Sequence, residues 1–184
     1  MFVYQLTPLR AEPAADAERV SEVLPGEPVA VLEERDGWAR IRTAYAYEGW
    51  LQAASLGADG DEGWLEPSAP DPLTAARRLL GVPYRWGGMT AAGIDCSGLV
   101  HMSFRAAGRL VPRDADQQEA AGTPVVEDPR PGDVISYGNP PDHVAFWAGG
   151  GTIVHATRRE GVDGVVEEAE PAELAIRRNA VFRL

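Results

Sequence analysis

The stretch Gly93-Ile94-Asp95-Cys96-Ser97-Gly98-Leu99-Val100 predicts the start of a helix with a cysteine in its first turn. A turn through Gly93 leads into apolar side chains at helical spacing that continue to Ala107, and Gly108 is expected to end the helix. Unpaired backbone N–H groups and the positive end of the helix dipole stabilise a thiolate in the first turn, so Cys96 is a candidate nucleophile behind an Asp95 cap. A buried structural cysteine is the alternative interpretation, since free cysteine is among the most buried residue types.

A cysteine nucleophile needs a base, and the chain offers three histidines. His101 lies five residues beyond Cys96, about 140° further around a helix, and should face elsewhere. His143 and His155 lie on consecutive predicted strands on either side of the turn Gly149-Gly150-Gly151. If Gly149 is the centre of that turn, the two histidines stand directly opposite one another on one face of the sheet. One imidazole could then orient the other, which completes the set of nucleophile, base and orienting group.

Cys96, His143 and His155 could instead be three ligands of a zinc ion. Neither a Cys-x-x-Cys pair nor a closely spaced histidine pair supports this interpretation, and no fourth ligand is evident for a closed structural site. An open catalytic zinc site remains an alternative at this point. We expect no metal and no cofactor.

The rest of the chain predicts two domains joined by Pro67-Ser68-Ala69-Pro70. Residues 1–66 are expected to form a small all-β barrel, and residues 71–184 an α+β domain with helices first and then a meander of strands. The predicted strands of the barrel are Phe2–Leu6, Pro28–Glu33, Trp38–Arg42 and Gly49–Gln52. The α+β domain is predicted to have helices at 73–80 and 94–107, strands at 134–137, 143–147 and 152–156, and an edge strand at 180–184.

The composition excludes several classes of protein. The 184 residues carry 17 basic side chains, all arginine, against 28 acidic ones, for a net charge of -11, and contain a single cysteine. The absence of lysine excludes Schiff-base chemistry, one cysteine excludes an intrachain disulfide, and the acidity argues against a nucleic-acid partner. Residues 1–70 hold 13 acidic and 5 basic side chains, so most of the excess lies in the predicted barrel. The first residues lack a basic segment followed by a continuous apolar one, so we expect a cytoplasmic protein without a membrane partner, non-classical export being the alternative.

The sequence resembles two known families. Gly26-Glu27-Pro28-Val29, Gly37-Trp38-Ala39-Arg40-Ile41 and Tyr47-Glu48-Gly49-Trp50-Leu51 resemble bacterial SH3-like domains. Six further motifs occur in the order typical of the papain-like NlpC/P60 peptidases, and this resemblance covers about 71–184. They are Pro83-Tyr84-Arg85-Trp86-Gly87-Gly88, the stretch 93–100, Pro112-Arg113-Asp114-Ala115-Asp116-Gln117, Pro131-Gly132-Asp133-Val134, Asp142-His143-Val144-Ala145 and Ile153-Val154-His155-Ala156.

The NlpC/P60 resemblance implies that Cys96 is the nucleophile, His143 the base and His155 the orienting residue. Together with the SH3-like domain it implies a γ-D-glutamyl-L-diamino acid endopeptidase that recycles murein peptides with a free N-terminal L-Ala. It further implies a set of substrate-binding residues. These are Asp95 and Ser97 at the substrate's amino end, Tyr84 near the oxyanion, Trp86 lining the cleft, Asp114, and Tyr47 of the barrel, for which Tyr45 is an alternative.

One position departs from the pattern: Ala115 stands where the resemblance leads us to expect a hydroxyl residue, which puts one substrate hydrogen bond in doubt. Two other functions remain alternatives. One is a different cysteine amidase or acyltransferase of the same fold, and the other a non-catalytic protein that binds cell-wall peptides. The sequence predicts neither the diamino acid that follows D-Glu nor the oligomeric state.

Overall fold

The computed structural model of the chain describes residues 1–58, 60 and 63–184. It divides into two units, Met1–Leu65 and Glu66–Leu184. The backbone N–H groups of Ser68 and Ala69, in the predicted linker, both donate to the carbonyl of Ala106 at 2.8 Å, so these linker residues are tied to the second unit. Three acidic residues of the predicted barrel, Asp59, Asp61 and Glu62, lie outside the described residues.

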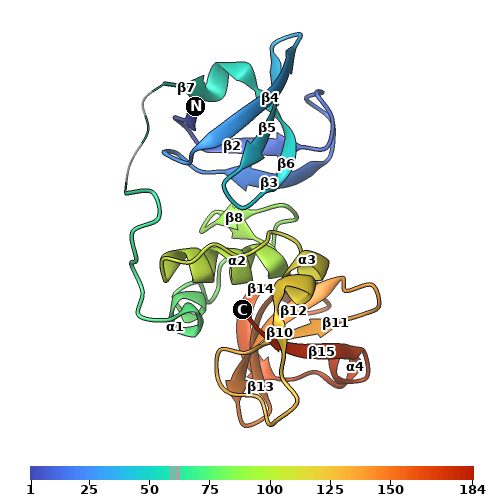
Figure 1. The fold of residues 1–184 in the computed structure, drawn as a ribbon. Coiled ribbons are helices and arrows are strands. Elements are labelled where there is room, and N and C mark those ends of the chain that lie inside the picture. The colour runs from blue at the N-terminus through green and yellow to red at the C-terminus, as the bar shows by residue number, and fades with distance from the viewer. Residues whose placement is uncertain (59, 61–62) are drawn as a thin grey trace. The chain divides into compact units, whose positions relative to one another are not determined.

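The N-terminal unit is built from short antiparallel strands (Figure 1). Five of them form a sheet in the order β3-β2-β6-β5-β4, and β1 pairs with β7. Their bounds are β1 Phe2–Val3, β2 Thr7–Arg10, β3 Arg19–Val23, β4 Val29–Arg35, β5 Trp38–Thr43, β6 Glu48–Gln52 and β7 Leu56–Gly57, with a 3-10 turn at Ala53–Ser55. The predicted strand Phe2–Leu6 is wrong, because the chain leaves the extended pairing after Val3 and begins a new strand at Thr7. Alternating side chains such as Leu9, Ile41 and Leu51 are fully buried and form the core of this unit.

In the C-terminal unit, helices α1 to α3 precede a six-stranded antiparallel sheet in the order β10-β15-β11-β12-β13-β14, and α4 lies between β14 and β15 in the sequence (Figure 1). The helices are α1 Pro72–Arg77, α2 Cys96–Ala106, α3 Ala115–Ala121 and α4 Ala172–Ala175. The strands are β8 Met89–Thr90, β9 Gly93–Ile94, β10 Thr123–Pro124, β11 Val134–Tyr137, β12 His143–Gly149, β13 Thr152–Arg159, β14 Val162–Ala169 and β15 Arg178–Arg183. The α+β prediction is confirmed. The C-terminal strand, β15, was predicted to be an edge strand, and this prediction is wrong. It pairs with β11 on one side and with β10 on the other.

The core of the C-terminal unit lies between α2 and one face of this sheet. Leu99, Val100 and Phe104 of α2 are buried in one cluster with Val144 and Phe146 of β12. Each fully buried side chain of this size contributes about 1.5–3 kcal/mol to the free energy of unfolding. This packing fixes the start of α2 next to β12. None of the helices in the described part of the chain has the length and apolar content needed to cross a bilayer.

Candidate active site

Helix α2 begins as the sequence predicts, with Asp95 at its N-terminal cap. The Asp95 Oδ1 atom accepts the backbone N–H of Gly98 at 2.6 Å, and Oδ2 accepts the backbone N–H of Gly87 at 2.7 Å. A Cβ on Gly98 would lie 2.4 Å from the Gly88 carbonyl oxygen, so only glycine fits there. The start of α2 therefore packs directly against the backbone of the turn at residues 87–88, and this contact fixes the position of Cys96.

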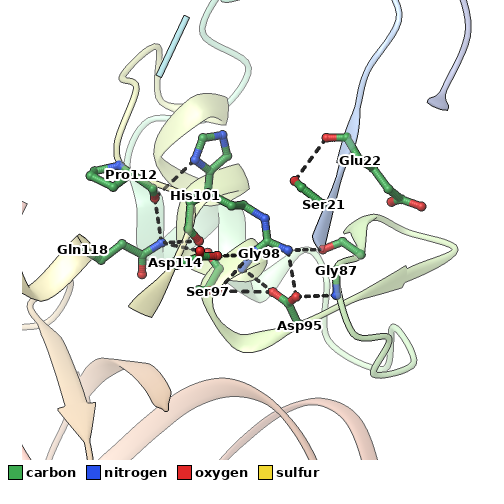
Figure 2. Close-up of polar contacts among 12 residues, drawn as sticks. Ser21, Glu22, Gly87, Asp95, Ser97, Gly98, His101, Pro112, Asp114 and Gln118 are labelled. Atoms are coloured by element: carbon green, nitrogen blue, oxygen red, sulfur yellow. Dashed lines mark hydrogen bonds and ion pairs between the residues drawn. The ribbon is translucent and has the colours of Figure 1, made fainter. Parts of the chain in front are cut away.

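Two residues predicted to bind the substrate's amino end, Asp95 and Ser97, already have partners within the unit (Figure 2). The buried guanidinium of Arg113 donates to Asp95 Oδ2 at 2.7 Å and to Ser97 Oγ at 2.8 Å. The Gln118 amide donates to the Ser97 carbonyl at 2.9 Å and to the Pro112 carbonyl at 2.9 Å. Sequence reasoning assigned no role to Arg113 or Gln118, although Arg113 stands in a quoted motif. Contact of Asp95 and Ser97 with substrate stays a prediction.

Cys96 is only 6% exposed and packs in one cluster with Val144, and the backbone N–H groups of Ser97 and Val144 lie near enough to its sulfur to affect its pKa. The proximity of Val144 places the sulfur beside β12, one residue after His143. Burial raises the pKa of the Cys96 thiol to about 12, and the Asp95 carboxylate adds to this, while the two N–H donors and Arg113 act in the opposite direction. We expected the helix N-terminus to lower this pKa. The backbone N–H groups do act in that direction, but removal of the thiolate from water has the larger effect, so the net pKa is raised.

His143 and His155 meet as predicted, although not in the predicted register. The Nε2 atom of His143 lies 2.9 Å from Nδ1 of His155, and the two rings meet edge to face with centroids 5.1 Å apart. Strands β12 and β13 pair Phe146 with Val154 and Trp147 with Ile153, which puts His155 two positions away from His143 rather than opposite it. The prediction erred because Gly149 is the last residue of β12 and part of an irregular pairing, and not the centre of the turn. A diagonal pair still shares one face of the sheet, and imidazoles are long enough to meet across it.

The second imidazole has a partner that sequence reasoning missed. His155 Nε2 lies 2.9 Å from Oε1 of Glu168 on β14, and both carboxylate oxygens of Glu168 accept from Nη2 of Arg159. The strand that carries Glu168 was not predicted. An available signal was the alternation of Val162, Gly164, Val166 and Glu168 after the turn at Gly161, which places these residues on one face.

Both histidines are held in the neutral form. Burial lowers the pKa of His143 to about 3, and the nearby His155 and Arg177 lower it further. Burial also lowers the pKa of His155, against the opposing effect of Glu168. The free site therefore combines a neutral thiol with a neutral imidazole at neutral pH.

His101 faces away from this site, as predicted. It is fully buried, and its Nδ1 atom lies 2.8 Å from the Val111 carbonyl oxygen. Because a carbonyl only accepts, this nitrogen carries the proton. Burial lowers the pKa of His101 to about 3.

The remaining predicted substrate residues of this unit lie around the start of α2. Tyr84 is half-buried, and Arg158 stacks 5.4 Å from its ring centre. Burial raises the pKa of Tyr84, and an ionised Cys96 and the Asp95 carboxylate raise it further, which places its phenol within electrostatic range of the predicted nucleophile. Trp86 is 58% exposed, so it does not belong to the core. Asp114 precedes α3 without capping it through its side chain, and lies 3.9 Å from Arg113.

Tyr47 belongs to the N-terminal unit and is described there. It follows a turn in which its backbone N–H donates to Thr43 Oγ1 at 3.0 Å, and its side chain packs partly against the core of that unit. Tyr45 lies within the same turn. The choice between Tyr47 and Tyr45 as a substrate contact remains a prediction.

The geometry does not fit a zinc site made of Cys96, His143 and His155. The facing nitrogens of the two histidines are bonded to each other, and the other nitrogen of His155 is bonded to Glu168. His155 therefore has no ring nitrogen directed at a common ion. Within residues 1–58, 60 and 63–184, no group of three His, Cys, Asp or Glu side chains is arranged to hold a metal ion.

Comparison with known proteins identifies the domain that carries this site. Residues 81–174, just over half of the chain, match the model of the NlpC/P60 family. The chain belongs to the NlpC/P60 family. Residues 9–56 match the bacterial dipeptidyl-peptidase Sh3 domain, so this NlpC/P60 protein also carries the SH3-like domain that the sequence predicted.

Named relatives of this NlpC/P60 protein are described as peptidases. It is 35% identical over 108 residues to a probable endopeptidase of Corynebacterium glutamicum, covering 56% of this chain and 51% of that protein. It is 28% identical over 134 residues to the gamma-D-glutamyl-L-lysine dipeptidyl-peptidase of Bacillus subtilis, covering 70% of this chain and 44% of that protein. The chain thus spans about half the length of the curated relatives it matches.

Almost the whole length of this NlpC/P60 protein has the fold of part of a solved structure. The crystal structure of an NlpC/P60 family protein from Bacillus cereus matches 99% of this chain and 62% of its own, with a TM-score of 0.60 and 23% identity. At this identity the match bears on the fold. Together with the two family-model matches, it confirms the predicted papain-like α+β domain and the SH3-like domain before it.

Proposed function

We propose that this protein is a cysteine endopeptidase that hydrolyses the γ-D-glutamyl-L-diamino acid bond of murein peptides with a free N-terminal L-Ala. The observation that carries the proposal is the 2.9 Å hydrogen bond between His143 and His155, next to Val144, which packs in one buried cluster with Cys96. The family and the described activity of the Bacillus subtilis relative support the substrate class.

The reaction begins with a neutral pair, because the pKa of Cys96 is raised and that of His143 lowered. The Nε2 atom of His143 is engaged by His155, which leaves Nδ1 to take the thiol proton. As the proton moves to His143, the sulfur forms a bond to the γ-carbonyl carbon of D-Glu. The carbon–nitrogen bond then breaks, and His143 protonates the departing amine of the diamino acid. Water hydrolyses the thioester, which releases L-Ala-γ-D-Glu and restores the thiol.

Negative charge on the carbonyl oxygen needs donors during this attack. Intrahelical bonds of α2 begin with the N–H of Leu99, which donates to the carbonyl of Asp95. The backbone N–H of Cys96 lies before that bond in the first turn and is therefore available to an oxyanion. We assign this N–H and the Tyr84 hydroxyl as the donors. One such donor is worth about 3 kcal/mol of transition-state stabilisation.

Recognition of the substrate's free amine is assigned to the Asp95 and Ser97 region. Arg113 binds both residues, so the Asp95 carboxylate brings no uncompensated negative charge of its own. The amine would therefore meet a polar surface in which oxygen lone pairs of Asp95 and Ser97 accept its hydrogen bonds. Selectivity for a free over an acylated amino end rests on this hydrogen bonding and on the size of the acyl group.

The test compares L-Ala-γ-D-Glu-L-Lys with its N-acetylated form, using the wild-type protein and the Cys96→Ala variant. We expect the wild-type protein to release L-Ala-γ-D-Glu from the free peptide only, and the variant to release none while its circular dichroism spectrum is unchanged. Equal cleavage of the acetylated peptide would refute recognition of the free amine. Binding of the peptide without cleavage by the wild-type protein would favour the non-catalytic alternative, and product release by Cys96→Ala would refute cysteine catalysis.

A further inference from the structure

The hydrogen-bond chain of the site extends beyond the predicted orienting residue. His155 is fully buried between two partners, with Nδ1 at 2.9 Å from His143 and Nε2 at 2.9 Å from Glu168. A neutral imidazole carries one N–H donor and one acceptor nitrogen, and which is which depends on its neighbours. The identity of the groups on either side therefore decides the tautomer of His155.

Glu168 is an acceptor in this position. The Arg159 guanidinium donates to both of its oxygens, and these bonds with Arg159 and His155 lower the pKa of Glu168 against the effect of its partial burial. An ionised carboxylate has no proton to donate, so His155 must direct its N–H at Glu168 from Nε2. The Nδ1 atom of His155 is then left with a lone pair facing His143.

We propose that Glu168 is a positioning residue of the reaction, because it fixes the tautomer in which His155 accepts the Nε2–H of His143. This inference rests on the proposed function. With His155 as acceptor, His143 presents an unprotonated Nδ1 to the thiol, and the imidazolium formed during attack keeps its Nε2–H bond. In the opposite tautomer His155 would donate to Nε2 of His143, so a neutral His143 would carry its proton on Nδ1 and could not accept the thiol proton there.

Among the described residues, the charged groups that act on His143 and His155 each have a partner of opposite charge. Arg177 lies near enough to His143 to lower its pKa, and donates to both carboxylate oxygens of Asp142. Arg159 lowers the pKa of His155, and is bound to Glu168. Glu168 is the carboxylate that contacts either imidazole, and its charge opposes that of Arg159.

The adjacent residue supplies a matched control. Glu167 lies on the same strand, is bound by Arg77 at 2.6 Å, and its side chain is 29% exposed against 27% for Glu168. Successive residues of a strand face opposite sides of the sheet, so Glu167 does not reach His155. Loss of either carboxylate removes one partly exposed ion pair with an arginine. Glu168 also contacts His155, and Glu167 does not.

The experiment measures kcat and KM for L-Ala-γ-D-Glu-L-Lys with Glu168→Leu, Glu168→Gln and Glu167→Leu. We expect Glu168→Leu to lower kcat about tenfold or more with KM within twofold of wild type, because loss of the tautomer impairs proton transfer and not substrate contact. Glu168→Gln keeps an acceptor oxygen and should lose less kcat. Glu167→Leu should retain wild-type kcat. Wild-type kcat in both Glu168 variants, or an equal loss in Glu167→Leu, would overturn the inference.

Imidazole ¹⁵N spectra test the same idea without turnover. The chain has three histidines, so their signals can be assigned with single variants. We expect His155 of the wild-type protein to be the Nε2–H tautomer, and Glu168→Leu to lose that preference. An Nδ1–H tautomer in the wild-type protein would overturn the inference even if a variant failed to fold. If the wild-type protein does not cleave the peptide, the proposed function fails, and the tautomer measurement still stands by itself.

Discussion

The guanidinium of Arg113 lies 2.7 Å from the carboxylate of Asp95, and the two side chains are 1% and 7% exposed. This ion pair joins the chain before α3 to the cap of α2 immediately ahead of Cys96. A buried charge is costly without its partner, because the interior cannot replace the water it has lost. The pair therefore holds the helix start in place.

Replacement of Arg113 by Met should destabilise the C-terminal unit by about 3–5 kcal/mol, since it leaves the Asp95 carboxylate buried and unpaired. Denaturant unfolding measures this loss. Arg78→Met is the control, because the Arg78 side chain is exposed and donates to the Ser68 carbonyl, and it should change stability by less than about 1 kcal/mol. Adding Asp95→Asn to Arg113→Met should recover part of the loss. A loss below about 1 kcal/mol in the first variant would contradict this account.

Replacement of Gly98 by Ala should cost about 1–3 kcal/mol of stability and reduce peptide cleavage, because the new Cβ would lie 2.4 Å from the Gly88 carbonyl oxygen. Relief of the clash must move the start of α2, and Cys96 with it. Gly57→Ala is the comparison, since a Cβ there would meet Tyr4 only at 3.9 Å. Thermal unfolding and the cleavage assay are the two measurements. Equal melting temperatures for the two variants would contradict the close approach.

Alkylation of Cys96 by iodoacetamide should be slow at pH 7 and should rise about tenfold per pH unit up to pH 9. The reason is that burial raises the pKa of the thiol to about 12, and only the thiolate reacts. Cys96 is the only cysteine in the chain, so mass spectrometry of the intact protein follows this one residue. A rate that is high and constant from pH 6 to pH 9 would show a preformed thiolate and contradict the neutral pair.

Stability should fall as pH decreases from 7 to 5, in part through His101. Its pKa is lowered to about 3 by burial, so below the ordinary value of about 6.5 the unfolded chain binds a proton that the folded chain excludes. One such group contributes up to about 2 kcal/mol over this interval, present at pH 7 and lost as pH falls. His101→Asn keeps a donor for the Val111 carbonyl and cannot take up the proton. Its unfolding free energy should therefore depend less on pH than that of wild type, and an unchanged slope would refute the assignment.

The parts of the fold with strong local signals could be predicted from the sequence. Asp95 and Gly108 bracket α2 as expected, and Gly149-Gly150-Gly151 separates β12 from β13. Each glycine of that turn has a positive φ, a conformation that other residues avoid. Helix caps and tight turns depend on residues that are neighbours in the sequence, so they can be predicted from it. The cap placed Cys96 at the start of α2, and the turn placed His143 and His155 on two adjacent strands.

The rest depends on contacts between distant segments. Strand β14 contains Gly164 and three acidic residues, which strands disfavour, and it forms because β13 offers it a continuous pairing edge. Glu168 was missed together with that strand. The raised pKa of Cys96 could not be predicted either, because local sequence reports the helix dipole and not the burial of the sulfur.

Cys96 and His143 come from different layers of the C-terminal unit, a helix and a sheet, and stand 47 residues apart in the chain. Neither layer holds both groups, so the reactive arrangement exists only once α2 has docked on β12 through side chains such as Val100 and Val144. A compact intermediate with formed helices and strands but loose packing would carry every residue of the site and have no activity. Turnover is thus a sensor of tertiary order in this domain. On mild acidification or heating it should be lost before the far-ultraviolet circular dichroism changes.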